Sequence, residues 1–352
     1  MRRFTRCGLP ELLGGRLSPR SFLTAWRCSE CGCQRARSGR MPELPEVETV
    51  RRQLEPELVG RTITALEIRD PRWCDPLAPA EFADVVVGRT VTRLRRRGKY
   101  LDWVLEGDVH LLMHLRMTGT LLLDPAQAPA HTRVVLTLDG ERLLLFVDPR
   151  RFGTGQLAIG TEALTAFFAG RLGVEPFDAA FTPALLRELA RGRQGAVKSF
   201  LLDQHMIAGI GNIYADEALF RVGVHPLRAA GALKPAQYAR LRDAIREVLT
   251  AGIDANGASI DDFRHLDGAR GSFQDRFLVH RREGEPCTVC GTTIRKLVVG
   301  GRGTYVCVRC QPVPRGSRAS ARGVRGTAAA PRATSAPATR PGAQTSRPPR
   351  AR

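Results

Sequence analysis

Residues 287–310, with the sequence CTVCGTTIRKLVVGGRGTYVCVRC, decide the fold of the C-terminal part of the chain. They contain two Cys-x2-Cys pairs, Cys287 with Cys290 and Cys307 with Cys310, separated by 16 residues. Each pair can present two thiolates to one metal ion, and two pairs on a hairpin complete a tetrahedral four-sulfur site. Such a closed site leaves no position for water, so we expect one structural Zn²⁺ and not a catalytic metal. The alternative is two unrelated redox or buried pairs.

Positive charge is concentrated outward from this finger, at the two ends of the chain. Residues 311–352 hold nine Arg and no acidic residue among many Ala, Pro, Ser, Thr and Gly, and we expect a disordered basic tail. Residues 1–40 hold nine Arg and two Glu without a hydrophobic period. Of the net charge of +19 over 352 residues, the body at 41–310 carries only +3. The case for a nucleic-acid partner therefore depends on individually placed residues, not on bulk charge.

The first half of the body contains short apolar runs between turn residues. The runs cover residues 62–68, 85–94, 100–105, 109–113, 119–123, 134–138, 142–147 and 155–159. This spacing is typical of antiparallel strands in a sandwich or barrel. A helix is predicted before them at 46–54, where Glu46 and Glu48 suit the positive end of the helix dipole.

The pattern becomes helical after Thr182. Thr182-Pro183 indicates an N-cap followed by proline at the first helical position. Helices are predicted at 183–191, 197–203, 213–220 and 235–251, followed by a long Gly- and Asp-rich loop at 254–272. We therefore expect an α+β fold: an N-terminal antiparallel β-sandwich, a helical domain and a C-terminal four-cysteine zinc finger. No stretch approaches the about 20 consecutive apolar residues that a membrane helix needs.

The segment Met41-Pro42-Glu43-Leu44-Pro45-Glu46-Val47-Glu48 can be interpreted in two ways. Inside a longer chain it is a helix entry marked by prolines. At the start of a protein, removal of the methionine would leave Pro42 with a free secondary amine. Such an amine is partly unprotonated at neutral pH and can form an iminium with a sugar aldehyde carbon. Glu43 would then lie beside it as a proton shuttle.

Over residues 42–310 the chain resembles the formamidopyrimidine-DNA glycosylases, bacterial enzymes that remove oxidised purines from DNA. The resemblance rests on Pro42-Glu43-Leu44-Pro45-Glu46-Val47-Glu48, Lys99-Tyr100, His114-Leu115-Arg116-Met117-Thr118-Gly119, Asp148-Pro149-Arg150-Arg151-Phe152-Gly153, Gly209-Ile210-Gly211-Asn212-Ile213-Tyr214-Ala215 and the four-cysteine finger. Each motif alone is weak, but together and in this order they are specific. The related endonuclease VIII-like branch fits less well, because it typically has Gly where Leu44 stands and lacks the loop at 254–272.

The resemblance implies a bifunctional DNA glycosylase and abasic-site lyase in base excision repair. Pro42 would attack the deoxyribose C1′, Glu43 would act as acid and base, and β,δ-elimination would follow. Lys99 and Arg302 complete the implied catalytic set as phosphate-binding cations. The implied substrates are 8-oxoguanine and formamidopyrimidines in double-stranded DNA, and abasic sites.

The resemblance also implies how DNA would be held once the damaged base is turned out of the stack. Met117, Arg150 and Phe152 would fill the space left by the base. The further DNA contacts implied are His114, His131, Lys198 and Asn212, with Glu217 in the lesion pocket. Seen alone, Met117 and Phe152 would be interpreted as strand core, the two histidines as surface groups, and Glu217 as a helix-surface carboxylate. The glycines of Gly209-x-Gly211-Asn212 would let backbone amides approach phosphate closely.

Two features depart from the family pattern. His280-Arg281 stand where the family usually has Tyr-Gly, so a phosphate contact made by the tyrosine is in question, although His280 could replace it. In addition, residues 1–41 precede Pro42, and in a continuous chain its nitrogen is an amide that cannot attack. The simplest hypothesis is that translation starts at Met41.

These inferences give a domain organisation and a set of competing functions. The predicted parts are an extension at 1–41, a catalytic sandwich at 42–175, a helix–two-turn–helix domain at 176–275, a zinc finger at 276–310 and a tail at 311–352. We expect a monomeric bacterial cytoplasmic enzyme. The alternatives are a non-catalytic damaged-DNA-binding protein with a blocked Pro42, and a zinc-ribbon RNA-binding protein.

Overall fold

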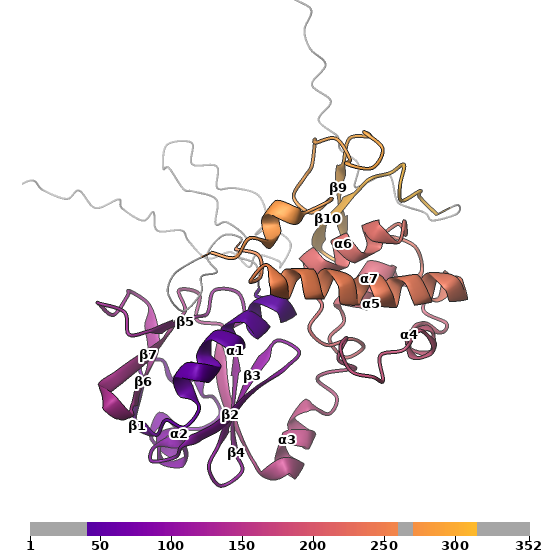
Figure 1. Cartoon of the computed structure of the whole chain (residues 1–352). Helices are drawn as coiled ribbons and strands as arrows, with labels where there is room; N and C mark the ends of the chain where they lie inside the picture. Colours follow the sequence, from indigo (N-terminus) through magenta and orange to yellow (C-terminus); the bar gives the residue numbers. More distant parts are fainter. Residues whose placement is uncertain (1–40, 260–269, 315–352) are drawn as a thin grey trace, which may run out of the picture. The chain divides into compact units, whose positions relative to one another are not determined.

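The computed structural model describes residues 41–259 and 270–314 (Figure 1). Contacts divide the chain into the units Met1–Gly39 and Arg40–Arg352, and every described residue belongs to the second unit. The predicted N-terminal extension up to residue 40, most of the predicted loop at 254–272 and nearly all of the predicted basic tail lie outside the described residues. Among the helices of the described ranges, none has the length and apolar character needed to cross a bilayer.

The N-terminal half forms a sandwich of two antiparallel sheets, as predicted. One sheet has the strand order β1-β6-β7-β5 and the other the order β2-β3-β4-β8. The strands of the first sheet are β1 (Ile63–Ile68), β5 (Thr120–Leu123), β6 (Thr132–Leu138) and β7 (Arg142–Val147). Those of the second are β2 (Val91–Arg97), β3 (Tyr100–Leu105), β4 (Val109–His114) and β8 (Thr154–Ile159).

The core of the sandwich contains large rings from elements far apart in sequence. Trp73, Phe82, Trp103 and Phe146 are all buried in one cluster with aliphatic side chains of both sheets. Helix α1 (Leu44–Leu58) adds its buried Val47, Val50, Leu54 and Leu58 to this cluster. Burial of such side chains stabilises each by about 1.5–3 kcal/mol. This packing fixes helix α1 against the sandwich, and with it the residues Pro42 and Glu43 that directly precede the helix.

Two helices in this half were not predicted. Helix α2 (Pro79–Val86) occupies part of residues 85–94, where the alternating apolar run predicted only a strand. Pro79 starts the helix, and Phe82 and Val86 place one apolar face in the core at the i,i+4 spacing. The strand begins only at Val91, so this prediction was wrong for the first residues of the run. Helix α3 (Gly160–Phe168) was also missed.

The second half is helical, with α4 (Pro183–Ala190), α5 (Val197–Leu202), α6 (Asn212–Arg221) and α7 (Pro235–Asp254). The predicted N-cap of α4 is confirmed, because Thr182 Oγ1 accepts a hydrogen bond of 3.1 Å from the Leu185 amide. Helices α6 and α7 pack closely, since a Cβ atom at Gly252 would lie 2.5 Å from the Tyr214 ring. Figure 1 shows α7 running beside α6.

The last two strands of the described residues, β9 (Arg295–Val299) and β10 (Arg302–Val306), form a hairpin. The hairpin lies between the two cysteine pairs, as the sequence indicated. Strand β10 contacts α6, so the finger is fixed to the helical region.

Candidate active site

The side chain of Glu43 reaches from the start of α1 to the start of α6. Pro42 and Glu43 are buried directly before α1. The Glu43 carboxylate accepts hydrogen bonds from the backbone amides of Ile213 (3.1 Å) and Tyr214 (3.5 Å). First-turn amides have no partner within their own helix and carry the positive end of its dipole, so they favour an anion. These contacts orient the carboxylate beside Pro42.

Two glycines before α6 make room for this contact. A Cβ atom at Gly211 would lie 2.1 Å from Glu43 Cδ, and one at Gly209 would lie 2.6 Å from Leu44 Cδ1. The Gly209 carbonyl also accepts a 3.0 Å hydrogen bond from the Leu44 amide. The sequence pattern was interpreted as a close approach to phosphate. In the structure both glycines approach the Glu43–Leu44 segment instead.

Glu46 is a buried carboxylate that sequence reasoning treated only as a partner of the helix dipole. It accepts hydrogen bonds from the Glu43 amide (2.9 Å), the Tyr214 hydroxyl (2.8 Å) and the Ala258 amide (2.7 Å). Burial, with a smaller contribution from the charge of Glu43, raises the pKa of Glu46 to about 7. The spacing of three residues between Glu43 and Glu46 is the capping-box signal that could have revealed this link.

Lys99 lies in the tight turn between β2 and β3, and a network of charges holds this turn in place. Gly98 has a φ of +57°, and its amide donates to Glu175. The Arg96 guanidinium donates to Glu175 at 3.0 Å and to Glu48 at 3.1 Å. The run of basic residues before Lys99 is thus partly a buried scaffold and not only a solvated strand end.

The Lys99 ammonium is buried within electrostatic range of other predicted catalytic groups. Burial lowers the pKa of Lys99, Glu43 raises it, and Arg302 lowers it further. Arg302 is exposed at the start of β10. Glu43, Lys99 and Arg302 therefore share one region although about 60 and 200 residues separate them in sequence.

His114 lies at the end of β4 with its tautomer defined by the backbone. Its Nδ1 accepts a 2.9 Å hydrogen bond from the Arg116 amide, so the ring proton is on Nε2 when the ring is neutral. Burial, helped by the charges of Arg116 and Lys99, lowers the pKa of His114 well below its usual value. The ring contacts Tyr100 edge to face, with centroids 4.5 Å apart. His114 can therefore offer a neutral N–H donor beside Lys99.

The three predicted space-filling residues lie in two loops at the end of the sandwich. Met117 is half-buried between β4 and β5, and Arg150 and Phe152 lie between β7 and β8. Phe152 is 49% exposed, and the Arg150 guanidinium carbon lies 5.1 Å from its ring centroid. The alternative of strand core is wrong for Phe152. His131 is exposed before β6, with Nδ1 3.3 Å from Arg133.

The structure places Lys198, a predicted DNA contact, inside the protein. Its side chain is fully buried, and the ammonium donates to Asp216 (2.7 Å), Thr304 Oγ1 (2.8 Å) and the Gly303 carbonyl (3.2 Å). The Asn212 amide donates to the same Gly303 carbonyl at 2.9 Å. Lys198 and Asn212 thus join the helices to the hairpin that carries Arg302.

Glu217 also differs from its prediction as a lesion-pocket residue. It is fully buried, and its carboxylate accepts hydrogen bonds from the amides of Leu278, Val279 and His280 at 3.0–3.1 Å. Arg221 adds an ion pair of 3.1 Å. With these four donors bound, the carboxylate fixes the segment that leads to the finger.

His280, the residue that could replace the phosphate contact of the usual tyrosine, packs inside the protein. The side chain is fully buried, and its Nδ1 lies 2.8 Å from Asp216 Oδ2. Its ring contacts Tyr305 with centroids 5.0 Å apart. The sequence alone does not show that Lys198, Glu217 and His280 are internal. Charged and polar residues are rarely fully buried unless they are paired, and their partners are known only from the structure.

The four predicted cysteines come together as a metal site. One ligand atom from each lies within 4.8 Å of the others, and the Cys290–Cys307 and Cys287–Cys310 sulfur distances are 3.4 Å and 3.9 Å. Tetrahedral zinc with Zn–S bonds of about 2.3 Å requires sulfur atoms about 3.8 Å apart. The donor set and its spacing therefore fit a closed, structural zinc site.

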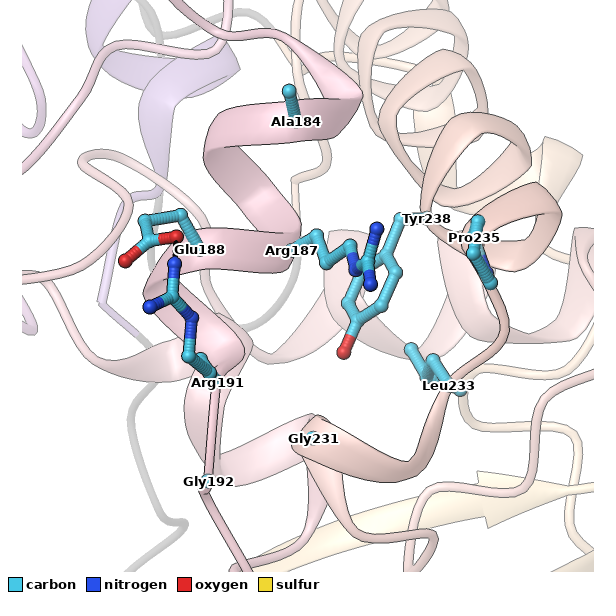
Figure 2. Close-up of a pocket in the computed structure, with 9 residues that line it drawn as sticks. All are labelled: Ala184, Arg187, Glu188, Arg191, Gly192, Gly231, Leu233, Pro235 and Tyr238. Atoms are coloured by element: carbon cyan, nitrogen blue, oxygen red, sulfur yellow. Dashed lines mark ion pairs between the residues drawn. The ribbon is translucent and has the colours of Figure 1, made fainter.

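A separate cavity of about 590 Å³ lies between α4 and the start of α7 (Figure 2). Its lining includes Arg187, Tyr238 and an ion pair between Glu188 and Arg191. None of the predicted site residues is among those that line it. The candidate active site is therefore the group of residues around Glu43, and this cavity is not part of it.

Family models cover nearly the whole described part of the chain. The formamidopyrimidine-DNA glycosylase N-terminal domain matches residues 41–155, and the family's H2TH domain matches 172–264. A zinc finger found in FPG and IleRS matches 284–313. The chain belongs to the formamidopyrimidine-DNA glycosylase family. The predicted family, the α+β fold and the zinc-finger module are thereby confirmed.

Individual relatives agree with this family. The formamidopyrimidine-DNA glycosylase of Syntrophotalea carbinolica is 44% identical over 274 residues, covering 77% of this chain and 100% of the relative. That of Symbiobacterium thermophilum is 46% identical over 80% of this chain and 93% of the relative. The protein is thus a DNA-binding DNA glycosylase of base excision repair.

Solved structures of family members superpose on the described fold. The MutM (Fpg) protein of Thermus thermophilus is 42% identical with a TM-score of 0.70, covering 77% of this chain and 98% of that one. Lactococcus lactis Fpg in complex with DNA containing an abasic site is 36% identical with a TM-score of 0.72. It covers 77% of this chain and all of the other.

Proposed function

We propose that the protein is a bifunctional glycosylase and abasic-site lyase that removes oxidised purines, 8-oxoguanine and formamidopyrimidines, from double-stranded DNA. The observation that carries the proposal is the position of Pro42 beside a carboxylate held by α6, with Lys99 and Arg302 in electrostatic range. One amine, one proton-transfer group and two cations for phosphates are the groups that this reaction requires.

In the proposed reaction the Pro42 nitrogen forms a bond to deoxyribose C1′ as the bond from C1′ to the base breaks, and the proton lost from the nitrogen passes to the departing base. The proton needed to open the sugar ring comes from Glu43, which returns to the carboxylate form on the α6 amides. The Glu43 carboxylate then takes a proton from C2′, which expels the 3′ phosphate, and a second elimination expels the 5′ phosphate. Lys99 and Arg302 neutralise the charge on these phosphates.

DNA binding by this chain would use the exposed groups at the end of the sandwich. Phe152 and Met117 are apolar wedges, and Arg150 supplies donors for the base left without its partner. The neutral His114 and the exposed His131 are proposed as backbone contacts. Asn212 stays a proposed contact, although one amide hydrogen already binds the finger.

The remaining proposals concern the metal, the assembly and the compartment. Zn²⁺ would bind Cys287, Cys290, Cys307 and Cys310 and hold the hairpin that carries Arg302. In this position it supplies structure and takes no part in the reaction. We further propose a monomer that works in the bacterial cytoplasm.

The test compares two forms of the protein, the full chain and a chain that starts at Met41. The second form contains every described residue of the compact unit that starts at Arg40. After removal of Met41, borohydride should trap it covalently on a duplex with 8-oxoguanine, and a Pro42→Gly variant should be trapped at least about tenfold more slowly. The full chain should not be trapped unless it is processed to Pro42.

If both forms bind damaged duplex and neither is trapped, the protein is a damaged-DNA-binding protein without catalysis. If both prefer RNA to damaged duplex, the function is that of an RNA-binding zinc ribbon. Either result contradicts the proposal.

A further inference from the structure

One fully buried carboxylate lies between the two loops that carry Met117, Arg150 and Phe152. Asp148 follows β7 and is fully buried. Its Oδ2 accepts hydrogen bonds from the amides of Phe152 (2.8 Å) and Gly153 (2.7 Å). Its Oδ1 accepts from the Arg150 amide at 3.2 Å and from the Thr118 hydroxyl. The Thr118 hydroxyl in turn accepts from the Arg150 amide at 3.3 Å.

These contacts cross from one loop to the other. Thr118 directly follows Met117 in the loop after β4, whereas Arg150 and Phe152 belong to the loop after β7. Four donors on one buried carboxylate form the type of charge-assisted network that fixes backbone geometry. All three space-filling side chains are therefore on, or directly beside, residues bound to Asp148.

Both loops also pack against the same aromatic ring. A Cβ atom at Gly119 would lie 2.8 Å from Phe146 Cε2, and one at Gly153 would lie 2.3 Å from Phe146 Cζ. The two glycines flank the Asp148 network on either side and leave the ring no free space. Both loops therefore pack directly on this part of the core.

The backbone of the loops is held in an unfavourable conformation. Arg116, which precedes Met117, has a φ of +55°, and Arg151, between Arg150 and Phe152, has a φ of +59°. Left-handed backbone costs a residue with a side chain about 1–2 kcal/mol. Such conformations persist only where surrounding contacts hold them, and they concentrate at functional sites. Here the contacts are the Arg116 amide on His114 Nδ1 at 2.9 Å, the amides on Asp148, and a two-point ion pair of Arg151 with Asp70 at 2.5 and 2.8 Å.

We propose that Asp148 and Thr118 are positioning residues that hold Met117, Arg150 and Phe152 as one preformed wedge for opening the DNA stack. The inference rests on the proposed function, because it assigns a role in turning out the damaged base. Asp148 does not touch DNA in this account. Because Asp148 holds both loops in place before DNA binds, no entropy is lost in ordering them when the wedge enters the DNA stack.

The test separates insertion from chemistry with two DNA substrates and three variants of the chain that starts at Met41. Thr118→Val removes the hydroxyl at nearly constant volume, Asp148→Asn replaces an acceptor oxygen by a donor, and Thr118→Ser keeps the hydroxyl. Excision of 8-oxoguanine from duplex DNA should slow by about tenfold or more in Thr118→Val and Asp148→Asn, and should be near wild type in Thr118→Ser. Borohydride trapping on a single-stranded abasic oligonucleotide needs no wedge and should stay within about twofold of wild type.

Insertion is also measured without any reaction. With 2-aminopurine opposite a stable abasic analogue in duplex DNA, fluorescence reports unstacking on binding. The rise seen with wild type should be reduced in Thr118→Val and Asp148→Asn, and the double variant should be no worse than Asp148→Asn alone. Thermal unfolding midpoints show whether each variant is folded.

Equal loss on single-stranded and duplex substrates, or unchanged duplex excision and fluorescence in folded Thr118→Val, would overturn the proposal. A wild-type protein that is never trapped would instead refute the proposed function. In that case the fluorescence comparison still decides whether Asp148 and Thr118 position the wedge.

Discussion

Replacement of Glu46 by Gln should change how the stability of the protein depends on pH. The buried carboxylate has its pKa raised from 4.5 to about 7. Below pH 4.5 both the folded and the unfolded chain hold the proton, and burial of the neutral acid carries no charge penalty. Between pH 4.5 and 7 the unfolded chain releases the proton while the folded chain keeps it. The free energy of unfolding therefore falls as pH rises through this window.

The shift of about 2.5 pKa units amounts to about 3 kcal/mol, at ~1.4 kcal/mol for each unit. In Glu46→Gln the carbonyl can still accept from the Tyr214 hydroxyl and the Ala258 amide, whereas the new NH₂ group faces the Glu43 amide. That loss costs about 1–3 kcal/mol at every pH. The pH-dependent part is therefore separable from the constant part.

Urea unfolding of wild type and Glu46→Gln at several pH values from 5 to 8 measures the difference. We expect the variant to gain about 2–3 kcal/mol relative to wild type between the two ends of this range. Glu162→Gln, at an exposed position in the first turn of α3, is the matched control and should show no such change. The error in the free energy of unfolding is roughly 0.5 kcal/mol. If the difference in this free energy between wild type and Glu46→Gln stays constant within that error from pH 5 to 8, the raised pKa of Glu46 is refuted.

Three further changes test other parts of the site. Gly211→Ala places a methyl group 2.1 Å from Glu43 Cδ and should lower kcat on 8-oxoguanine duplex about a hundredfold. The control Gly195→Ala, where the added methyl group meets open space, should not lower kcat. Equal kcat values for the two variants would show that this position of Glu43 is not needed for catalysis. Lys198→Met leaves Asp216 buried without its cation and should lower the free energy of unfolding by about 3 kcal/mol without DNA. The control Lys296→Met, at an exposed position, should have little effect on the free energy of unfolding. If Lys198→Met is as stable as wild type, Lys198 is not a structural cation, and the prediction of a DNA contact is favoured. Chelation should remove one metal ion per chain, as measured by elemental analysis, and should weaken DNA binding. The circular dichroism signal of the sandwich should persist. Unchanged DNA binding without metal would contradict a role for the finger.

The sequence carries the fold well where local patterns and core packing agree. Strands β3 and β7 begin and end where the apolar runs predicted, and Thr182-Pro183 starts α4 as expected. Helix α2 was missed because Val85 and Val86 look like strand residues. Their helix forms because Phe82 and Val86 share one face against the sandwich core, and tertiary contact outweighs local preference.

The sequence predicted the site residues that belong to recognisable family motifs, but not which charged side chains are enclosed by internal partners. Glu43, Lys99 and the cysteines follow from motif spacing and are brought together by the fold. Lys198 and Glu217 carry the same charges as surface contacts would, and only the structure shows that each is enclosed by its partners. Asp148 belongs to a quoted motif but received no role, because its partners are mostly backbone amides, which the side-chain pattern does not reveal.

The central claim is that the nitrogen of Pro42 bonds to the sugar of the damaged nucleotide. The most direct test is mass spectrometry of the borohydride-trapped complex of the chain that starts at Met41, after digestion of protein and DNA. The account predicts the sugar adduct on the peptide that begins with Pro42, with its nitrogen as the modified atom. An adduct on Lys99, or a trapped complex of equal yield from Pro42→Gly, would contradict it.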